Sequence, residues 1–99
     1  MPFTKVAIEE NLEIAKPPMY KVILHNDDYT PMDFVIDILV KIFHKSLDEA
    51  EDIMWQVHTK GKAVCGVYVK EIATTKVHQV KTSAKANGFP LLATIEFEG

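Results

Sequence analysis

The sequence predicts an α+β domain, in which three helices pack on one face of a three-stranded antiparallel or mixed sheet in the order β-α-α-β-α-β. Three observations support this prediction. Short runs rich in β-branched and aromatic residues occur at 20–25, 62–70 and 91–97. The segments between them carry apolar residues at helical spacing. The chain has 99 residues, 47% of them hydrophobic, which suits one core and leaves no room for a second domain.

The first predicted strand is followed at once by Asn26, Asp27 and Asp28. Asn and Asp are favoured in turns for local reasons, so a purely structural role is one interpretation. Thr30 is expected to cap the next helix with its hydroxyl, and one cap needs one acceptor. Asn26 and Asp27 are then left over for a ligand, which is the second interpretation.

The first helix should place Pro31 in its first position and Asp33 near its positive end. Its wide apolar face consists of Phe34, Val35, Ile38, Leu39, Ile42 and Phe43. The second helix begins with Ser46 and Glu49, a capping-box pattern, and ends near Gly61. Its apolar stripe consists of Leu47, Ala50, Ile53, Met54 and Val57.

The second strand, at 62–70, contains Gly66, which indicates a bulge or a close backbone approach. The third helix is expected over 73–87, before a glycine and a proline, with an apolar stripe of Val77, Val80 and Ala84. The last strand, at 91–97, alternates apolar and polar residues.

The order of these elements predicts the order of the strands in the sheet. One helix joins the second and third strands, which favours a parallel pair connected by a right-handed crossover. The first strand then fits between them, antiparallel to both. This arrangement places Asn26, at the end of the first strand, beside Leu91, at the start of the third.

Composition excludes several classes of function. The formal net charge is -3 and no cluster of Lys and Arg occurs, which argues against nucleic acid as a partner. No apolar run approaches the roughly 20 residues of a membrane span, and no secretory signal is seen. We therefore expect no membrane partner and a cytoplasmic location.

The sequence also lacks the patterns of a metal centre or an enzyme. Cys65 is the only cysteine, and the four histidines show no metal-binding spacing, so no metal or cofactor is expected. Asp27 and Asp28 are sequence neighbours whose side chains tend to point apart. No nucleophile motif or glycine-rich phosphate loop is present. We expect a protein that is not an enzyme.

Two pairs of residues at helical spacing could form a pocket. Met54 and His58 are four residues apart, and Met32 and Val35 are three apart, so each pair shares a helix face. Apolar residues at such spacing are ordinarily core. Two methionines beside a polar rim also suit a deformable pocket, and both interpretations stay open.

From about residue 17 to the C-terminus, the chain closely resembles the ClpS family. The resemblance lies in four segments in the same order: residues 19–24, 26–32, His58 followed by 61–66, and 90–92. ClpS proteins are bacterial adaptors that deliver substrates with destabilising N-terminal residues to a ClpA-type AAA+ unfoldase and the ClpP protease. The resemblance implies a core domain at 19–99, and we expect residues 1–18 to form a flexible extension.

The resemblance also implies a site. Asn26, Asp27 and His58 would bind the free α-amino group of a substrate's first residue. That residue's side chain would enter a pocket formed by Asp28, Thr30, Met32, Val35, Met54, Val57 and Leu91. Met32 corresponds to a gate that excludes branched side chains, which leaves N-terminal Leu, Phe, Tyr and Trp as ligands.

Glu71 and Lys76, which look like exposed charges near the start of the third helix, correspond to the family's unfoldase-docking surface. An alternative keeps the fold and changes the role: a protein-protein docking domain of the ribosomal-stalk type. In that case the polar stretch only starts a helix, and the protein does not recognise N-termini.

Overall fold

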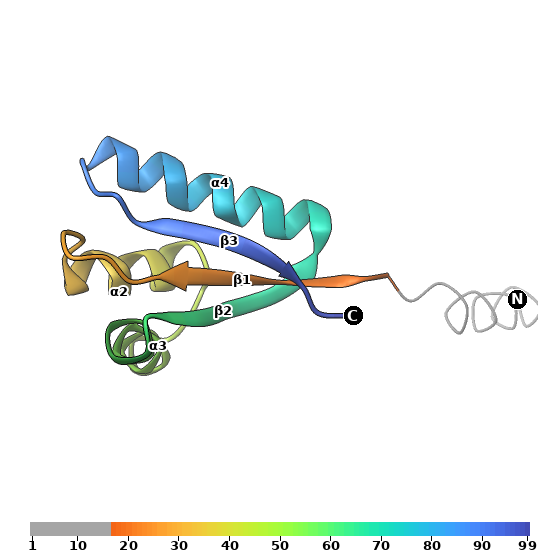
Figure 1. Cartoon of the computed structure of the whole chain (residues 1–99), viewed down its shortest axis with the longest axis horizontal. Helices are drawn as coiled ribbons and strands as arrows, with labels where there is room; N and C mark the ends of the chain where they lie inside the picture. Colours follow the sequence, from red (N-terminus) through yellow and green to blue (C-terminus); the bar gives the residue numbers. More distant parts are fainter. Residues whose placement is uncertain (1–16) are drawn as a thin grey trace, which may run out of the picture.

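The computed structural model describes residues 17–99, which form six elements around one core (Figure 1). In chain order they are β1 (Met19–His25), α2 (Met32–Lys41), α3 (Leu47–Lys60), β2 (Lys62–Val69), α4 (Lys70–Ala86) and β3 (Leu92–Phe97). The predicted fold class and element order are confirmed. The expected extension, residues 1–18, lies outside the described residues except for its last two.

β1 is the central strand of the sheet, whose order is β2-β1-β3. It runs antiparallel to both neighbours, so β2 and β3 are parallel to each other, as predicted. At the end of β1, His25 pairs with Lys62 on one side and with Leu92 on the other. Asn26 therefore follows β1 at the edge where β3 begins, which confirms its predicted position near Leu91.

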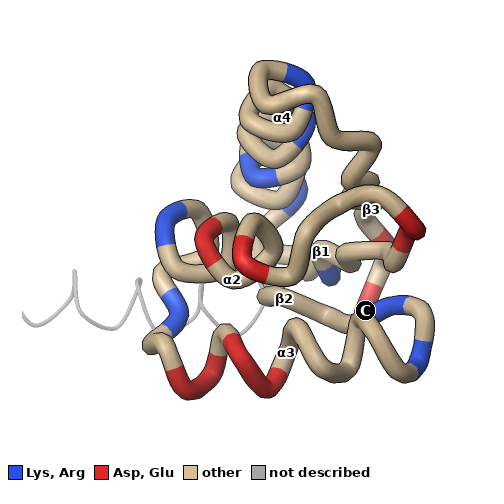
Figure 2. Tube along the Cα trace, turned by 90° about the vertical axis from the view of Figure 1, so that its left-hand side faces the viewer, with Lys and Arg blue, Asp and Glu red and all other residues tan. Residues whose placement is uncertain are grey.

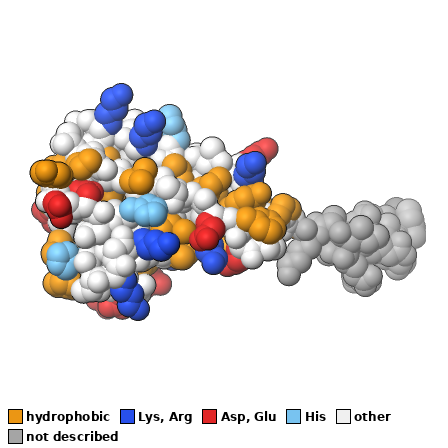
Figure 3. Space-filling model, in the orientation of Figure 1, with side chains coloured by type: hydrophobic (Ala, Val, Ile, Leu, Met, Phe, Trp, Pro, Cys, Tyr) orange, Lys and Arg blue, Asp and Glu red, His pale blue; other side chains and the backbone are white. Residues whose placement is uncertain are grey.

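The helices bury one face of the sheet. Val22 and Leu24 of β1 are fully buried in a core cluster that includes residues from α2, α3 and α4. Figure 2 shows the three helices grouped around the strands. The other face is open to solvent, and Figure 3 shows hydrophobic side chains scattered over it among charged ones. Exposed residues on the strands include Val64, Val67 and Leu92. No helix within residues 17–99 is long and apolar enough to cross a membrane.

The start of α2 differs from the prediction. Pro31 is the N-cap residue, in extended conformation, and no side chain caps the helix. The prediction that Thr30 caps α2 is wrong because its hydroxyl donates a hydrogen bond to Asp27 instead, at 2.8 Å. Pro31 has no N–H to satisfy, and the Phe34 N–H of the first turn donates a hydrogen bond to the Asp33 carboxylate at 2.9 Å.

α3 begins and ends as predicted. The Ser46 hydroxyl accepts a hydrogen bond from the Glu49 N–H, and the Glu49 carboxylate accepts one from the Ser46 N–H, which completes the capping box. Gly61 ends the helix in the left-handed conformation, with φ 89°, which residues with a Cβ rarely adopt. This sharp end leads directly into β2.

β2 contains the predicted bulge. The β1–β2 register pairs Val22 with Gly66 and Ile23 with Val64, so Cys65 is the extra residue. A Cβ on Gly66 would collide with the Tyr68 ring, which explains why glycine suits this position. Cys65 is 1% exposed, and burial raises the pKa of its thiol to about 12. It packs as a small residue of the core.

α4 begins at Lys70, three residues earlier than the predicted start at residue 73. Val69 is its N-cap residue, in extended conformation, and makes no capping hydrogen bond with its side chain. β2 thus passes into α4 without a loop. The apolar stripe that predicted the helix consists of Val77, Val80 and Ala84, so it does not mark the first turn.

Candidate functional site

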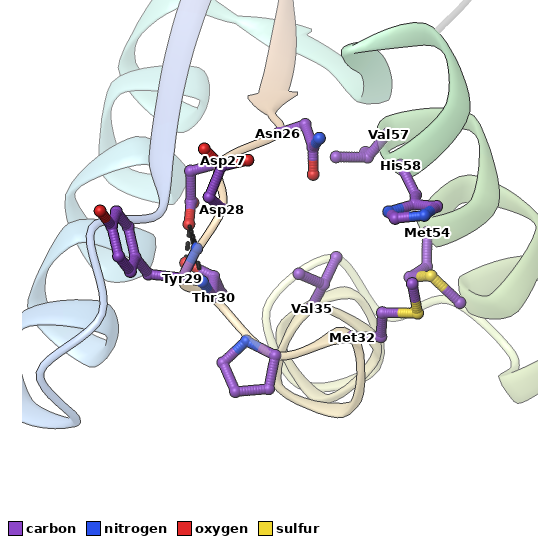
Figure 4. A pocket seen from close by; sticks show the side chains of 11 residues that line it. Asn26, Asp27, Asp28, Tyr29, Thr30, Met32, Val35, Met54, Val57 and His58 are labelled. Carbon is purple, nitrogen blue, oxygen red and sulfur yellow. Dashed lines mark hydrogen bonds between the residues drawn. The ribbon is translucent and has the colours of Figure 1, made fainter.

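A cavity of about 380 Å³ opens between the β1–α2 loop, the start of α2 and the second half of α3 (Figure 4). It is lined by Asn26, Asp27, Asp28, Tyr29, Thr30, Pro31, Met32, Val35, Met54, Val57 and His58. The structure therefore brings together every residue predicted for the amine site and the side-chain pocket, except Leu91. Tyr29 and Pro31 were not predicted, and their only sequence signal is that they lie inside the same stretch.

The two helices supply the apolar part of the cavity. Val35 of α2 and Met54 and Val57 of α3 are buried and form its floor. Met32 is 39% exposed and lies on the rim. In Figure 4 the side chains of Met32 and Met54 lie close together on the side of the cavity below His58. The floor thus consists of buried core side chains, whereas the flexible side chain of Met32 lies at the entrance.

Leu91 lies behind the cavity. It borders a second space of only about 10 Å³, and this space shares Asn26, Thr30, Val35 and other wall residues with the main cavity. Such a volume is close to that of a single water probe. Leu91 therefore lies next to residues that line the cavity but is not itself part of its lining.

Asp27 shapes the loop that forms one side of the cavity. Its Oδ1 accepts hydrogen bonds from the backbone N–H groups of Tyr29, at 2.8 Å, and Thr30, at 2.6 Å, and its Oδ2 accepts one from the Thr30 hydroxyl. This is an Asx-type turn. The expectation that Asp27 is left over from local structure is wrong, because the turn depends on it.

The same hydrogen bonds keep Asp27 ionised. Partial burial alone would raise the pKa of its carboxyl group, but the hydrogen bonds from Thr30 and Tyr29 outweigh burial and lower the pKa below its ordinary value of 3.8. Asp28 adds a second formal negative charge on this side, and no Lys or Arg is among the described residues that line the cavity. The loop side of the cavity therefore favours a cation.

Asn26 and His58 face the cavity from two different elements. The Asn26 N–H donates a hydrogen bond to the Gly61 carbonyl at 2.8 Å, which ties the loop to the end of α3. Figure 4 shows the Asn26 amide and the His58 imidazole on the upper side of the cavity, across from Val35. Within residues 17–99 neither side chain has a hydrogen-bond partner. Both can therefore accept a hydrogen bond from a ligand.

The two residues predicted for unfoldase docking lie at the other end of the molecule, where α4 begins (Figure 1). Glu71 is exposed in the first turn of α4. Lys76 is half-buried: its Nζ donates a hydrogen bond to the Ile42 carbonyl at 2.7 Å and lies 5.8 Å from the centre of the Tyr68 ring. The expectation of a simply exposed charge is wrong for Lys76, which ties α4 to the end of α2.

Comparison with known proteins gives one family. Residues 15–94 match the family ATP-dependent Clp protease adaptor protein ClpS. The ATP-dependent Clp protease adapter protein ClpS of Desulforapulum autotrophicum is 54% identical over 82 residues, which cover 83% of this chain and 79% of the relative. The protein of the same name from Serratia proteamaculans is 52% identical over 95 residues, which cover 95% and 90%.

A solved structure is similar in both sequence and fold. It is that of Agrobacterium tumefaciens ClpS2 bound to L-phenylalaninamide, at 42% identity and a TM-score of 0.81. The match covers 84% of this chain and 100% of the other. On the strength of these matches, over most of its length and with the same fold, the chain belongs to the ClpS family of ATP-dependent Clp protease adaptor proteins.

Proposed function

We propose that the cavity binds the first residue of a substrate protein through its free α-amino group and a bulky apolar side chain, Leu, Phe, Tyr or Trp. The observation that supports this most directly is that one cavity has both an apolar floor and a negatively charged rim rich in hydrogen-bond acceptors. The ligand of the Agrobacterium relative, L-phenylalaninamide, has both groups, an amine and a phenyl ring.

The rim suits an ammonium group. An ammonium has three donors and no acceptor, so an amide oxygen, a carboxylate and a neutral imidazole nitrogen are fitting partners. Asn26 and His58 supply two of them. A carboxylate offers about four acceptor positions, and Asp27 uses three of them within the loop, so one remains for the ligand. Each hydrogen bond to the charge contributes roughly 1.5–3 kcal/mol.

The floor suits one large side chain. The volume of about 380 Å³ falls within the range of roughly 300–1,000 Å³ that is typical of ligand pockets. Burial of a Leu or Phe side chain contributes roughly 1.5–3 kcal/mol. Each hydrogen bond to the amine and the burial of the side chain are then of similar size, so a ligand that lacks either group should bind much more weakly.

Met32 is the proposed gate. Replacement of Met32 with alanine should allow Val or Ile in the first position of a peptide, because a β-branched side chain no longer meets the thioether at the entrance. The test is a fluorescence-anisotropy titration with peptides that differ only in the first residue: Phe, Leu, Val or Ile. Met32→Leu is the matched control, since it keeps the volume, and it should still reject Val and Ile. If Met32→Ala binds Phe but still rejects both, Met32 is not the gate.

We further propose that the protein delivers these substrates to a ClpA-type AAA+ unfoldase in the cytoplasm, for degradation by ClpP. The unfoldase would dock at the start of α4, which lies away from the cavity, so that substrate and unfoldase can be bound together. Glu71→Lys should then slow the degradation of a Phe-initiated substrate and leave the affinity for the peptide unchanged. Unaltered degradation would place the docking surface elsewhere.

A further inference from the structure

Trp55 is the only tryptophan of the chain, and 50% of its surface is exposed. It lies on α3 one turn before His58. The indole and imidazole rings pack edge to face, with centroids 5.7 Å apart and an interplanar angle of 76°. Trp55 thus contacts a proposed amine-binding side chain but does not line the cavity itself.

The helix places Trp55 just outside the cavity. Successive residues of an α-helix are rotated by about 100°, so the order around α3, from the floor outward, is Val57, Met54, His58 and then Trp55. Burial follows the same order: Val57 is 3% exposed and Met54 5%, whereas His58 and Trp55 are exposed. The indole is therefore the next surface beyond His58 on the solvent side.

A bound substrate would present its second residue to this surface. Side chains of an extended chain alternate in direction, so when the first enters the cavity the second points out of it and reaches only the rim. Tyr29 is the other exposed aromatic residue of the rim, but in Figure 4 its ring points away from the cavity. Trp55 is then the exposed aromatic surface that adjoins the proposed amine-binding side chain of His58.

We propose that Trp55 forms a subsite for the second residue of the substrate and favours a large apolar side chain there. This inference rests on the proposed recognition of N-terminal residues, and it adds a determinant of specificity to it. Packing of an aliphatic or aromatic side chain on the exposed indole buries apolar surface of both groups. A peptide with glycine in the second position has no side chain to pack on Trp55, so this contact adds nothing to its affinity.

The test compares the full chain with two labelled peptides that share every residue except the second, Phe-Leu and Phe-Gly. The wild-type protein should bind Phe-Leu more tightly by about threefold to tenfold. Trp55→Ala should reduce this ratio to less than about twofold. The ratio is the readout because a change in the orientation of His58 would weaken both peptides equally. Ile72→Ala, which replaces an exposed apolar residue on α4, should leave the ratio as in wild type.

The outcomes separate this inference from the function it rests on. If wild type binds both peptides equally, or if Trp55→Ala keeps the preference for Phe-Leu, the proposed subsite is wrong. The proposed recognition of the first residue is unaffected by that result. If wild type binds neither peptide, recognition of the first residue fails and the subsite fails with it. As the only tryptophan, Trp55 also gives a direct signal: its emission should change more with Phe-Leu than with Phe-Gly.

Discussion

Replacement of Asp27 with alanine is expected to lower both the affinity for a Phe-initiated peptide, by roughly 100-fold, and the free energy of unfolding, by about 1–2 kcal/mol. The substitution removes all three hydrogen bonds that Asp27 makes with Tyr29 and Thr30, together with one negative charge of the rim. The loop loses the turn that positions Asn26 and Thr30 at the cavity. Peptide titration and urea unfolding measure the two effects.

Asp27→Asn separates the two roles of this side chain. Its amide oxygen can still accept hydrogen bonds from the backbone, so most of the stability should return, whereas the charge that attracts the ammonium is absent. We therefore expect near wild-type unfolding with weakened peptide binding. If Asp27→Ala has the stability and affinity of wild type, the loop does not depend on Asp27 and the account of the rim is wrong.

The lowered pKa of Asp27 also predicts a dependence on pH. The folded protein holds this carboxylate more strongly ionised than the unfolded chain does, so its stabilising effect is present above the ordinary pKa of 3.8. The effect is lost as pH falls through the lower pKa of the folded state. Asp27→Asn cannot titrate, so the stability of this variant should change less than that of wild type over this acidic range.

Replacement of His58 with alanine is expected to weaken binding of the same peptide by more than about tenfold and to leave stability nearly unchanged. The imidazole is exposed and makes no hydrogen bond within residues 17–99, so the fold loses little. The ligand loses one acceptor for its ammonium. Anisotropy titration measures the loss. His78→Ala is the matched control, because it removes an exposed histidine from α4 and should bind as wild type. Equal affinities of the two variants would exclude His58 from the amine site.

Much of the fold is readable from the sequence because each element carries its own pattern. The capping box of Ser46 and the glycine end at Gly61 fix α3, and the crossover rule places β1 in the middle of the sheet. The prediction fails where a helix starts without a side-chain cap. Pro31 and Val69 both start helices from extended conformation, so α2 and α4 begin at positions that no polar residue marks.

Part of the site is also readable, since helical spacing alone puts Met54, Val57 and His58 on one face. What the sequence does not show are the contacts that the fold creates. The hydrogen bond from Lys76 to the Ile42 carbonyl joins residues 34 positions apart, and no local pattern reports it. The three hydrogen bonds of Asp27 are local, but a polar run such as Asn26 to Asp28 allows several turn geometries.

The most direct test of the central claim, that the cavity binds a free N-terminus, is a titration with two labelled peptides that begin with Phe and differ only at the α-amine. One carries the free amine and the other an acetyl group, which removes the charge and two of the three donors. We expect the free peptide to bind and the acetylated peptide to bind at least about 100-fold more weakly. Equal affinities would contradict amine recognition and favour a docking domain of the ribosomal-stalk type.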